Sequence, residues 1–84
     1  HTLPNLAPWD SHLVNIQVHP NANLVNKTLM KAQLRNKYGI NIVAIQRGME
    51  TIVAPKPQEV ILPMDTLIIL GTDAQIDQAR PDLE

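Results

Sequence analysis

The sequence predicts a small α+β domain. A mixed or antiparallel sheet would carry a short helix pair after its first strand and a short helix at the C-terminal end. Two observations support this class. Apolar residues alternate with polar ones in some segments and recur at helical spacing in others. Short hairpin connections dominate and one crossover is present, which is typical of an α+β sandwich.

The first predicted strand is His12–Val18, where polar and apolar side chains alternate with a period of two. In a strand such alternation sends successive side chains to opposite faces. Val14, Ile16 and Val18 are therefore expected to point inward.

Two short helices are predicted next, at roughly Lys27–Ala32 and Leu34–Tyr38. Asn23 could begin the helical region, because its side chain can accept hydrogen bonds from free N–H groups. The apolar positions form two stripes that are out of phase, and Met30 and Leu34 belong to the second. Two separate helical pieces would bury both stripes.

A glycine stop and a hairpin follow the helices. Gly39 suits the left-handed residue that ends a helix, because it has no Cβ. The run Ile40–Gln46 is strongly β-prone and apolar on both faces, which favours a central strand or one that meets a partner. Arg47–Glu50 is predicted as a turn, Thr51–Ala54 as the returning strand and Val60–Leu62 as a short edge segment.

The last predicted strand is Thr66–Gly71, and a closing helix is expected over Asp73–Arg80. Thr72 or Asp73 can cap this helix at its start. Pro81 is expected to lie beyond its end, since proline lacks the N–H that helices use.

Composition limits the classes of function. The chain has 84 residues, of which 44% are hydrophobic, no cysteine and a formal charge of −1. This argues for one small folded domain, without disulfides and without the basic surface of nucleic-acid-binding proteins. No apolar run approaches the roughly 20 residues that span a bilayer, so the fragment is expected to be soluble. Because small domains are marginally stable alone, self-association is also expected.

The domain is predicted to occupy residues 11–80. Residues 1–10 are rich in Pro and Asn and resemble a linker from an upstream region. Residues 81–84 are expected to form a tail, in which Leu83-Glu84 matches residues that expression vectors place ahead of affinity tags.

Neither catalysis nor metal binding is indicated. Ser11 is the sole serine, and the adjacent His12 would point to the opposite face of a strand. His12 and His19 lack a recognisable metal-ligand spacing. The chain is therefore predicted not to be an enzyme and to hold no metal.

Arg35, Asn41 and Arg47 are the polar residues that stand out, and a functional interpretation is available for Arg35 and Asn41. The turn at Gly39 would bring the end of the helix and the start of the strand together. Arginine could then bind phosphate oxygens and asparagine an adenine edge. Alternatively, Arg35 caps helix carbonyls and Asn41 satisfies a turn.

Short motifs along most of the chain follow the order found in one family. They are Asn26-Lys27-Thr28-Leu29, Leu34-Arg35, Tyr38-Gly39-Ile40-Asn41, Arg47-Gly48, Pro55-Lys56-Pro57, Met64-Asp65-Thr66-Leu67 and Leu70-Gly71. This order resembles the TrkA-C domain, the C-lobe of the regulator of potassium conductance. The family pattern has glycine where Asn26 and Met64 stand here.

The resemblance implies a homodimer whose cleft holds a regulator, with cyclic di-AMP or another nucleotide as the candidate. The ligand-binding residues that it implies or suggests are Leu29, Arg35, Asn36, Asn41, Ile42 and Pro57. The alternative is a pure dimerisation or interaction module without a small-molecule ligand.

The resemblance also implies a regulatory domain at the cytoplasmic face of the membrane, attached in cis to an upstream transmembrane transport domain. The transporter would carry potassium or exchange sodium or potassium for protons. Ala7-Pro8-Trp9-Asp10, just before the first strand, favours a monovalent cation/proton antiporter.

Overall fold

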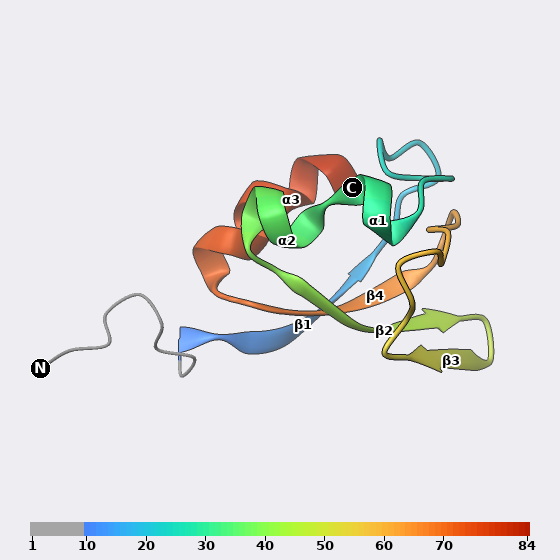
Figure 1. Ribbon diagram of the computed structural model, residues 1–84, viewed down its shortest axis with the longest axis horizontal. Helices are drawn as coiled ribbons and strands as arrows, with labels where there is room; N and C mark the ends of the chain where they lie inside the picture. Colours follow the sequence, from blue (N-terminus) through green and yellow to red (C-terminus); the bar gives the residue numbers. More distant parts are fainter. Residues whose placement is uncertain (1–9) are drawn as a thin grey trace, which may run out of the picture.

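The computed structural model describes residues 10–84, so the predicted linker lies outside the described residues except for Asp10. Seven regular elements follow one another in this range (Figure 1). They are β1 (His12–Gln17), α1 (Leu29–Ala32), α2 (Leu34–Tyr38), β2 (Asn41–Arg47), β3 (Glu50–Val53), β4 (Thr66–Gly71) and α3 (Asp73–Leu83). The predicted strands and helices are thus found in the predicted order, apart from the edge segment discussed below.

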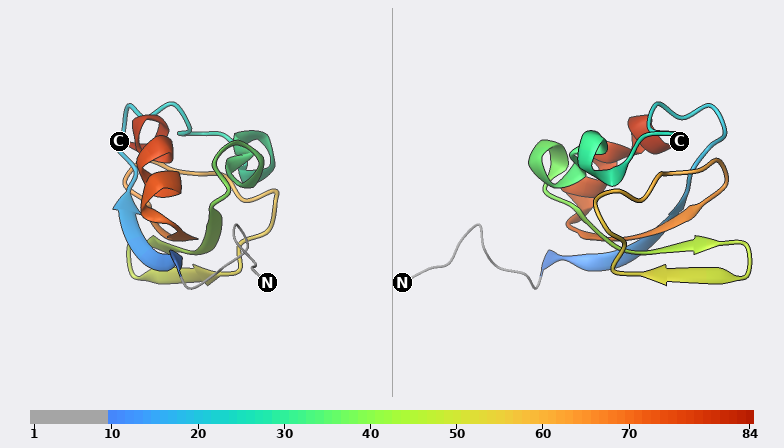
Figure 2. Two further views of the ribbon diagram at one scale, coloured as in Figure 1. Left: turned by 90° about the vertical axis from the view of Figure 1, so that its left-hand side faces the viewer. Right: turned by 45° about the vertical axis from the view of Figure 1, so that its right-hand side comes forward.

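The four strands form one sheet in the order β1-β4-β2-β3, and every neighbouring pair is antiparallel. All three helices cover one face of this sheet, as the end-on view in Figure 2 shows. The predicted α+β class and antiparallel sheet are confirmed. β3 pairs with β2 over Ala44–Arg47 alone, whereas β4 pairs with β2 from Asn41 onward. The first residues of β2 therefore have a strand neighbour on one side only.

The core lies between the sheet and the helices. Ile16, Leu67 and Ile45 are direct neighbours across three strands, and all three are almost fully buried. Adjacent to this row, Ile69 is buried and Val14 is partly buried. The inward face predicted for the first strand is confirmed.

The helix pair begins later than expected. Asn23 does not start a helix, because residues 20–27 form a series of turns and Asn23 instead donates to Asp82. The cap of α1 is Thr28, whose hydroxyl accepts from Lys31 N–H at 3.2 Å. Gln33 joins α1 to α2 in the left-handed conformation, with φ 50°.

The apolar residues of the helix pair are not all buried, as the two predicted stripes would require. Leu34 is buried as expected. Met30 is 59% exposed, so the prediction that its side chain would be buried was wrong. The left-handed Gln33 reorients the chain between the two residues, and the rotation buries Leu34 while leaving Met30 at the surface.

The closing helix is longer than predicted. α3 has a full capping box between Thr72 and Gln75 and continues through Pro81 to Leu83. The expected end at Arg80 was wrong. Leu83 is fully buried, and its carbonyl accepts from His19 N–H at 2.9 Å. These tertiary contacts outweigh the single helical hydrogen bond that proline removes.

Residues 54–65 connect β3 to β4 without joining the sheet. The predicted edge segment at Val60–Leu62 is not a strand of this sheet, since Val60 forms an isolated bridge with Thr28. The connection follows the start of α1, because Ile61 exchanges backbone hydrogen bonds with Asn26 and Lys27. This connection supplies one wall of the site described next.

Candidate functional site

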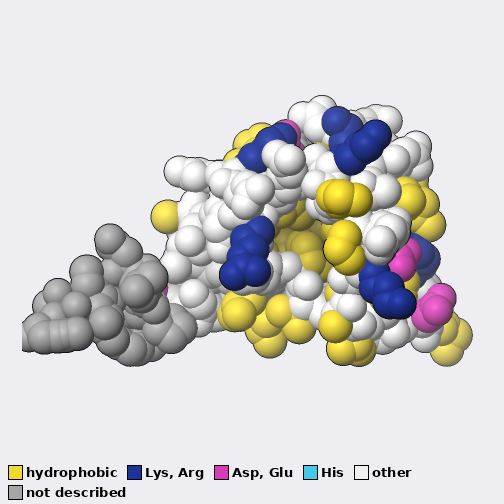
Figure 3. Space-filling model, viewed as in Figure 1, with side chains coloured by type: hydrophobic (Ala, Val, Ile, Leu, Met, Phe, Trp, Pro, Cys, Tyr) yellow, Lys and Arg dark blue, Asp and Glu magenta, His cyan; other side chains and the backbone are white. Residues whose placement is uncertain are grey.

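A pocket opens on the face formed by α1, α2, the start of β2 and the connection after β3. Its volume is about 440 Å³. Its lining consists of Leu29, Met30, Leu34, Arg35, Ile40, Asn41, Ile42, Pro55 and Pro57. Figure 3 shows this face as a hollow with a hydrophobic floor and basic side chains at its margins. The lining is therefore apolar apart from one guanidinium and one amide.

The turn at Gly39 brings Arg35 and Asn41 into the same pocket. α2 ends at Tyr38, and Gly39 follows with φ 78°. The N–H of Gly39 donates to the carbonyl of Arg35 at 2.9 Å, which closes the helix. β2 begins two residues later at Asn41, one residue after the predicted start of the strand, and extends to Arg47, one residue beyond its predicted end.

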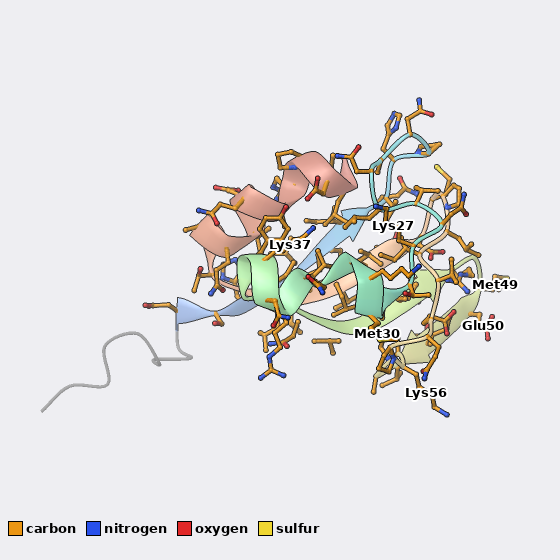
Figure 4. All side chains as sticks on the ribbon, turned by 45° about the horizontal axis from the view of Figure 1, so that its top comes forward. Lys27, Met30, Lys37, Met49, Glu50 and Lys56 are labelled. Carbon is orange, nitrogen blue, oxygen red and sulfur yellow. The ribbon has the colours of Figure 1, made fainter. Side chains whose placement is uncertain are left out.

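Pro55 and Pro57, in the connection after β3, form a further wall of the pocket, and backbone hydrogen bonds join this connection to α1. Met30 N–H donates to the carbonyl of Pro57 at 3.0 Å, and Leu29 N–H donates to that of Glu59 at 2.9 Å. Figure 4 shows Met30 and Lys56, which precedes Pro57, on the same side of the molecule. The carbonyl groups of the connection thus accept hydrogen bonds from the free N–H groups in the first turn of α1.

Arg35 is the cation of this pocket. The Arg35 side chain is exposed. The arginines that form ion pairs within residues 10–84 are Arg47 and Arg80 instead. A guanidinium without a carboxylate partner is available to an anionic ligand, which it can bind through two parallel N–H groups. The pocket can therefore hold a flat apolar group on its floor and an anion at its rim.

The sequence-predicted residues meet at this pocket with one exception. Leu29, Arg35, Asn41, Ile42 and Pro57 line it. Asn36 is exposed on α2 and is not among the lining residues. That these residues bind a ligand stays a prediction.

Four lining residues were not predicted: Met30, Leu34, Ile40 and Pro55. Pro55 and Ile40 could have been found, because they adjoin predicted residues in the Pro-x-Pro and Gly-Ile-Asn motifs. Met30 could not, since it belongs to the stripe that helical periodicity assigns to the core.

Arg47, at the predicted Arg-Gly turn, lies outside this pocket. Its Nε and Nη2 donate to the two carboxylate oxygens of Asp65 at 2.9 and 2.8 Å. The same guanidinium reaches Glu59 at 3.2 Å and the carbonyl of Val60 at 2.9 Å. Hydrogen bonding to Asp65 raises the pKa of Arg47 above its ordinary value.

A second hollow, of about 580 Å³, is lined by Asn26, Lys27, Thr28, Lys31 and Gln33. Its lining contains no apolar residue, and its cations, Lys27 and Lys31, are exposed. Among residues 10–84, no group of three or more His, Cys, Asp and Glu side chains could hold a metal ion. No helix in the same range is long and apolar enough to cross a membrane.

The comparison with protein families matches residues 13–83 to the TrkA-C domain. The chain belongs to the TrkA-C domain family. TrkA-C domains are regulatory and non-enzymatic, so this chain is not an enzyme, as its sequence predicts.

A curated relative of this TrkA-C domain is the Ktr system potassium uptake protein C of Bacillus subtilis (strain 168), which is 44% identical over 63 residues. The match covers 75% of this chain and 28% of that protein. The chain therefore spans little more than a quarter of that relative's length.

Two solved structures share the fold. One is the RCK C domain of the potassium transport protein KtrA in complex with cyclic di-AMP, with TM-score 0.74 and 29% identity. That match covers 81% of this chain and 78% of the other. The second is the RCK_C domain dimer of BusR from S. agalactiae with the same nucleotide, with TM-score 0.79, 22% identity, and coverage of 84% and 88%.

Proposed function

We propose that this TrkA-C domain senses a small nucleotide and dimerises, and thereby regulates a potassium transport protein. The single observation that carries the proposal is the pocket, in which Asn41 and Arg35, a guanidinium without an ion-pair partner within residues 10–84, flank an apolar floor. Apolar pockets with a few convergent polar groups are the usual form of a small-molecule site.

Cyclic di-AMP is the preferred ligand, because its parts match the parts of the pocket. An adenine ring can lie against Leu29, Ile42 and the proline wall. The Arg35 guanidinium can bind a phosphodiester through two charge-assisted hydrogen bonds. The Asn41 amide offers both a donor and an acceptor, which is what the edge of adenine requires. The KtrA relative, at 29% identity, is described in complex with this nucleotide.

A homodimer is the proposed assembly. Cyclic di-AMP has two identical halves, and a two-fold dimer presents two copies of one pocket to a two-fold ligand. Val43 is 37% exposed beside the pocket residue Ile42, although its carbonyl accepts from Ala54 N–H at 2.9 Å. This supports the expectation that a two-sided apolar strand meets a second copy. Asn36 would then contact ligand that extends beyond one pocket towards the partner.

The parent protein is proposed to transport a monovalent cation, with this domain at the cytoplasmic face of the membrane. The potassium uptake relative favours potassium transport over the cation/proton antiporter that the sequence before β1 suggests. A transmembrane domain upstream in cis remains part of the proposal. The full-length gene tests it: several apolar spans of about 20 residues are expected, and an upstream soluble protein would refute attachment in cis.

Two measurements on the 84-residue chain test the assembly and the ligand. Sedimentation at tens of micromolar should reveal a dimer, and a strict monomer would exclude this assembly. Calorimetric titration with cyclic di-AMP should show saturable heat, whereas AMP should bind more weakly because it offers one adenine and one phosphate. A dimer that gives neither heat nor a thermal shift with a nucleotide panel would make the pure interaction module the better account.

A further inference from the structure

One wall of the pocket belongs to a segment that has little regular structure of its own. Pro55 and Pro57 lie in the connection 54–65, which the sheet does not include. An irregular segment holds its position only if other groups hold it there. The spacing between this wall and α1 therefore depends on the contacts of the connection.

Arg47, the last residue of β2, binds the connection at three points. Its guanidinium donates to the carboxylates of Glu59 and Asp65 and to the carbonyl of Val60. The side chain of Asp65 is almost fully buried, and one of its oxygens also accepts from Leu62 N–H at 2.9 Å. The guanidinium thus ties the second half of the connection to the end of a central strand.

The same connection holds the first turn of α1. Glu59 accepts from Arg47 through its carboxylate and from Leu29 N–H through its carbonyl. Two residues earlier, the carbonyl of Pro57 accepts from Met30 N–H. Leu29, Met30 and Pro57 line the pocket, and Arg47 does not. Hydrogen bonds through Glu59 thus join Arg47 to α1, and the segment from Pro57 to Glu59 is bonded to two successive residues of that helix.

We propose that Arg47 is a positioning residue for the pocket. It holds Glu59 and Val60, and these hold α1 against the Pro55–Pro57 wall at the spacing that a ligand requires. The part of the proposal that concerns ligand affinity rests on the proposed function. The part that concerns the order of α1 stands on the hydrogen bonds alone.

Arg47→Lys is the main test variant, because it keeps a positive charge beside buried Asp65 but cannot form the planar set of bonds. Glu59→Gln is the milder second variant, since it leaves the Arg47–Asp65 pair and all backbone carbonyls intact. Arg80→Lys is the matched control: Arg80 also pairs with two carboxylates, Asp77 and Glu84, but on the exposed side of α3.

Amide hydrogen exchange is the measurement that separates positioning from general stability. In Arg47→Lys, exchange at Leu29 and Met30 should rise about tenfold more than at Leu67 and Ile69 in the central strand β4. Glu59→Gln should give the same pattern at smaller amplitude, and Arg80→Lys should leave all four amides unchanged. A uniform rise at all four amides in Arg47→Lys, or no rise, would overturn the proposal.

Titration with cyclic di-AMP completes the test. Arg47→Lys should weaken binding about tenfold although the residue does not touch the pocket, and Arg80→Lys should bind as the unchanged chain does. Normal binding in Arg47→Lys would overturn the positioning role and leave the proposed function standing. If the unchanged chain binds no cyclic di-AMP, the proposed ligand fails, and the exchange pattern still decides whether Arg47 orders α1.

Discussion

The side-chain nitrogen of Gln75 lies 2.7 Å from the position that a Cβ on Gly39 would occupy. Gln75 also completes the capping box of α3, since its side-chain oxygen accepts from Thr72 N–H at 2.9 Å. The start of α3 therefore packs against the turn that brings Arg35 and Asn41 to one pocket. A side chain at Gly39 would be strained by the left-handed backbone and would displace the end of the Gln75 side chain.

We expect Gly39→Ala to destabilise the domain by about 2–3 kcal/mol. Roughly 1 kcal/mol comes from the left-handed backbone and a further 1 kcal/mol or more from displacing Gln75 and losing the capping box. Gly48→Ala is the control, because Gly48 also has positive φ but has no atom within 4 Å of the added Cβ. Urea denaturation measures the free energy of unfolding of both variants. Equal losses in the two would show that the Gln75 side chain moves aside freely.

Met64→Gly should stabilise the domain by about 0.5 kcal/mol. Met64 has φ 70° at a position where the family pattern has glycine, and its side chain is 55% exposed. Relief of left-handed strain is partly offset by the greater entropy of glycine in the unfolded chain. The denaturation midpoint should rise without a change in slope.

Asn26→Gly provides the comparison for Met64→Gly. Asn26 has the same φ of 70° at the other position where the family pattern has glycine. Asparagine tolerates the left-handed region, so this substitution should change stability little. A larger gain in Asn26→Gly than in Met64→Gly would contradict backbone strain as the cause.

The contact between Tyr38 and Asp82 should make stability depend on pH. The Tyr38 hydroxyl donates to Asp82, and this bond, followed by one from Asn23, lowers the pKa of Asp82 below its ordinary 3.8. The stabilisation is therefore complete above pH 3.8 and lost as pH falls through the folded-state pKa. The same bond raises the pKa of Tyr38 above its ordinary 10.0. The stabilisation that the tyrosine contributes is therefore complete below pH 10.0 and is lost as the pH rises through the folded-state pKa.

Tyr38→Phe tests this dependence. At pH 7 the substitution should lower the free energy of unfolding by about 1 kcal/mol, the scale of a partly exposed hydrogen bond to a charged group. The difference from the unchanged chain should shrink below pH 3.8, as Asp82 becomes protonated. A difference that is the same at acidic and neutral pH would show that the lost hydroxyl, and not the carboxylate charge, accounts for it.

Arg35→Ala should weaken cyclic di-AMP binding about 30-fold, which corresponds to about 2 kcal/mol for a charge-assisted contact. Lys31→Ala removes the same charge from α1, outside this pocket, and should have a small effect. Calorimetry measures both. Equal losses would indicate general attraction between charges, and an unchanged affinity in Arg35→Ala would exclude contact with the phosphate.

Local sequence patterns were sufficient for most elements because their causes are local. Alternation placed β1, Gly39 ended α2 and Thr72 began α3 through its own side chain. Five of the six predicted site residues line one pocket, and for Arg35 and Asn41 the cause is also local, since the Gly39 turn joins them over a short stretch of chain.

Contacts between distant parts of the chain decided the remaining features. Met30 is exposed because the left-handed Gln33 reorients the chain after α1. The pairing of Arg47 with Asp65 and Glu59 follows from the path of the connection after β3, which no periodicity specifies. The sequence by itself therefore determined the elements, their order and the polar residues of the pocket. Only the tertiary structure decided the position of the Pro55–Pro57 wall and the extension of α3 to buried Leu83. Both depend on hydrogen bonds and burial between segments far apart in the chain.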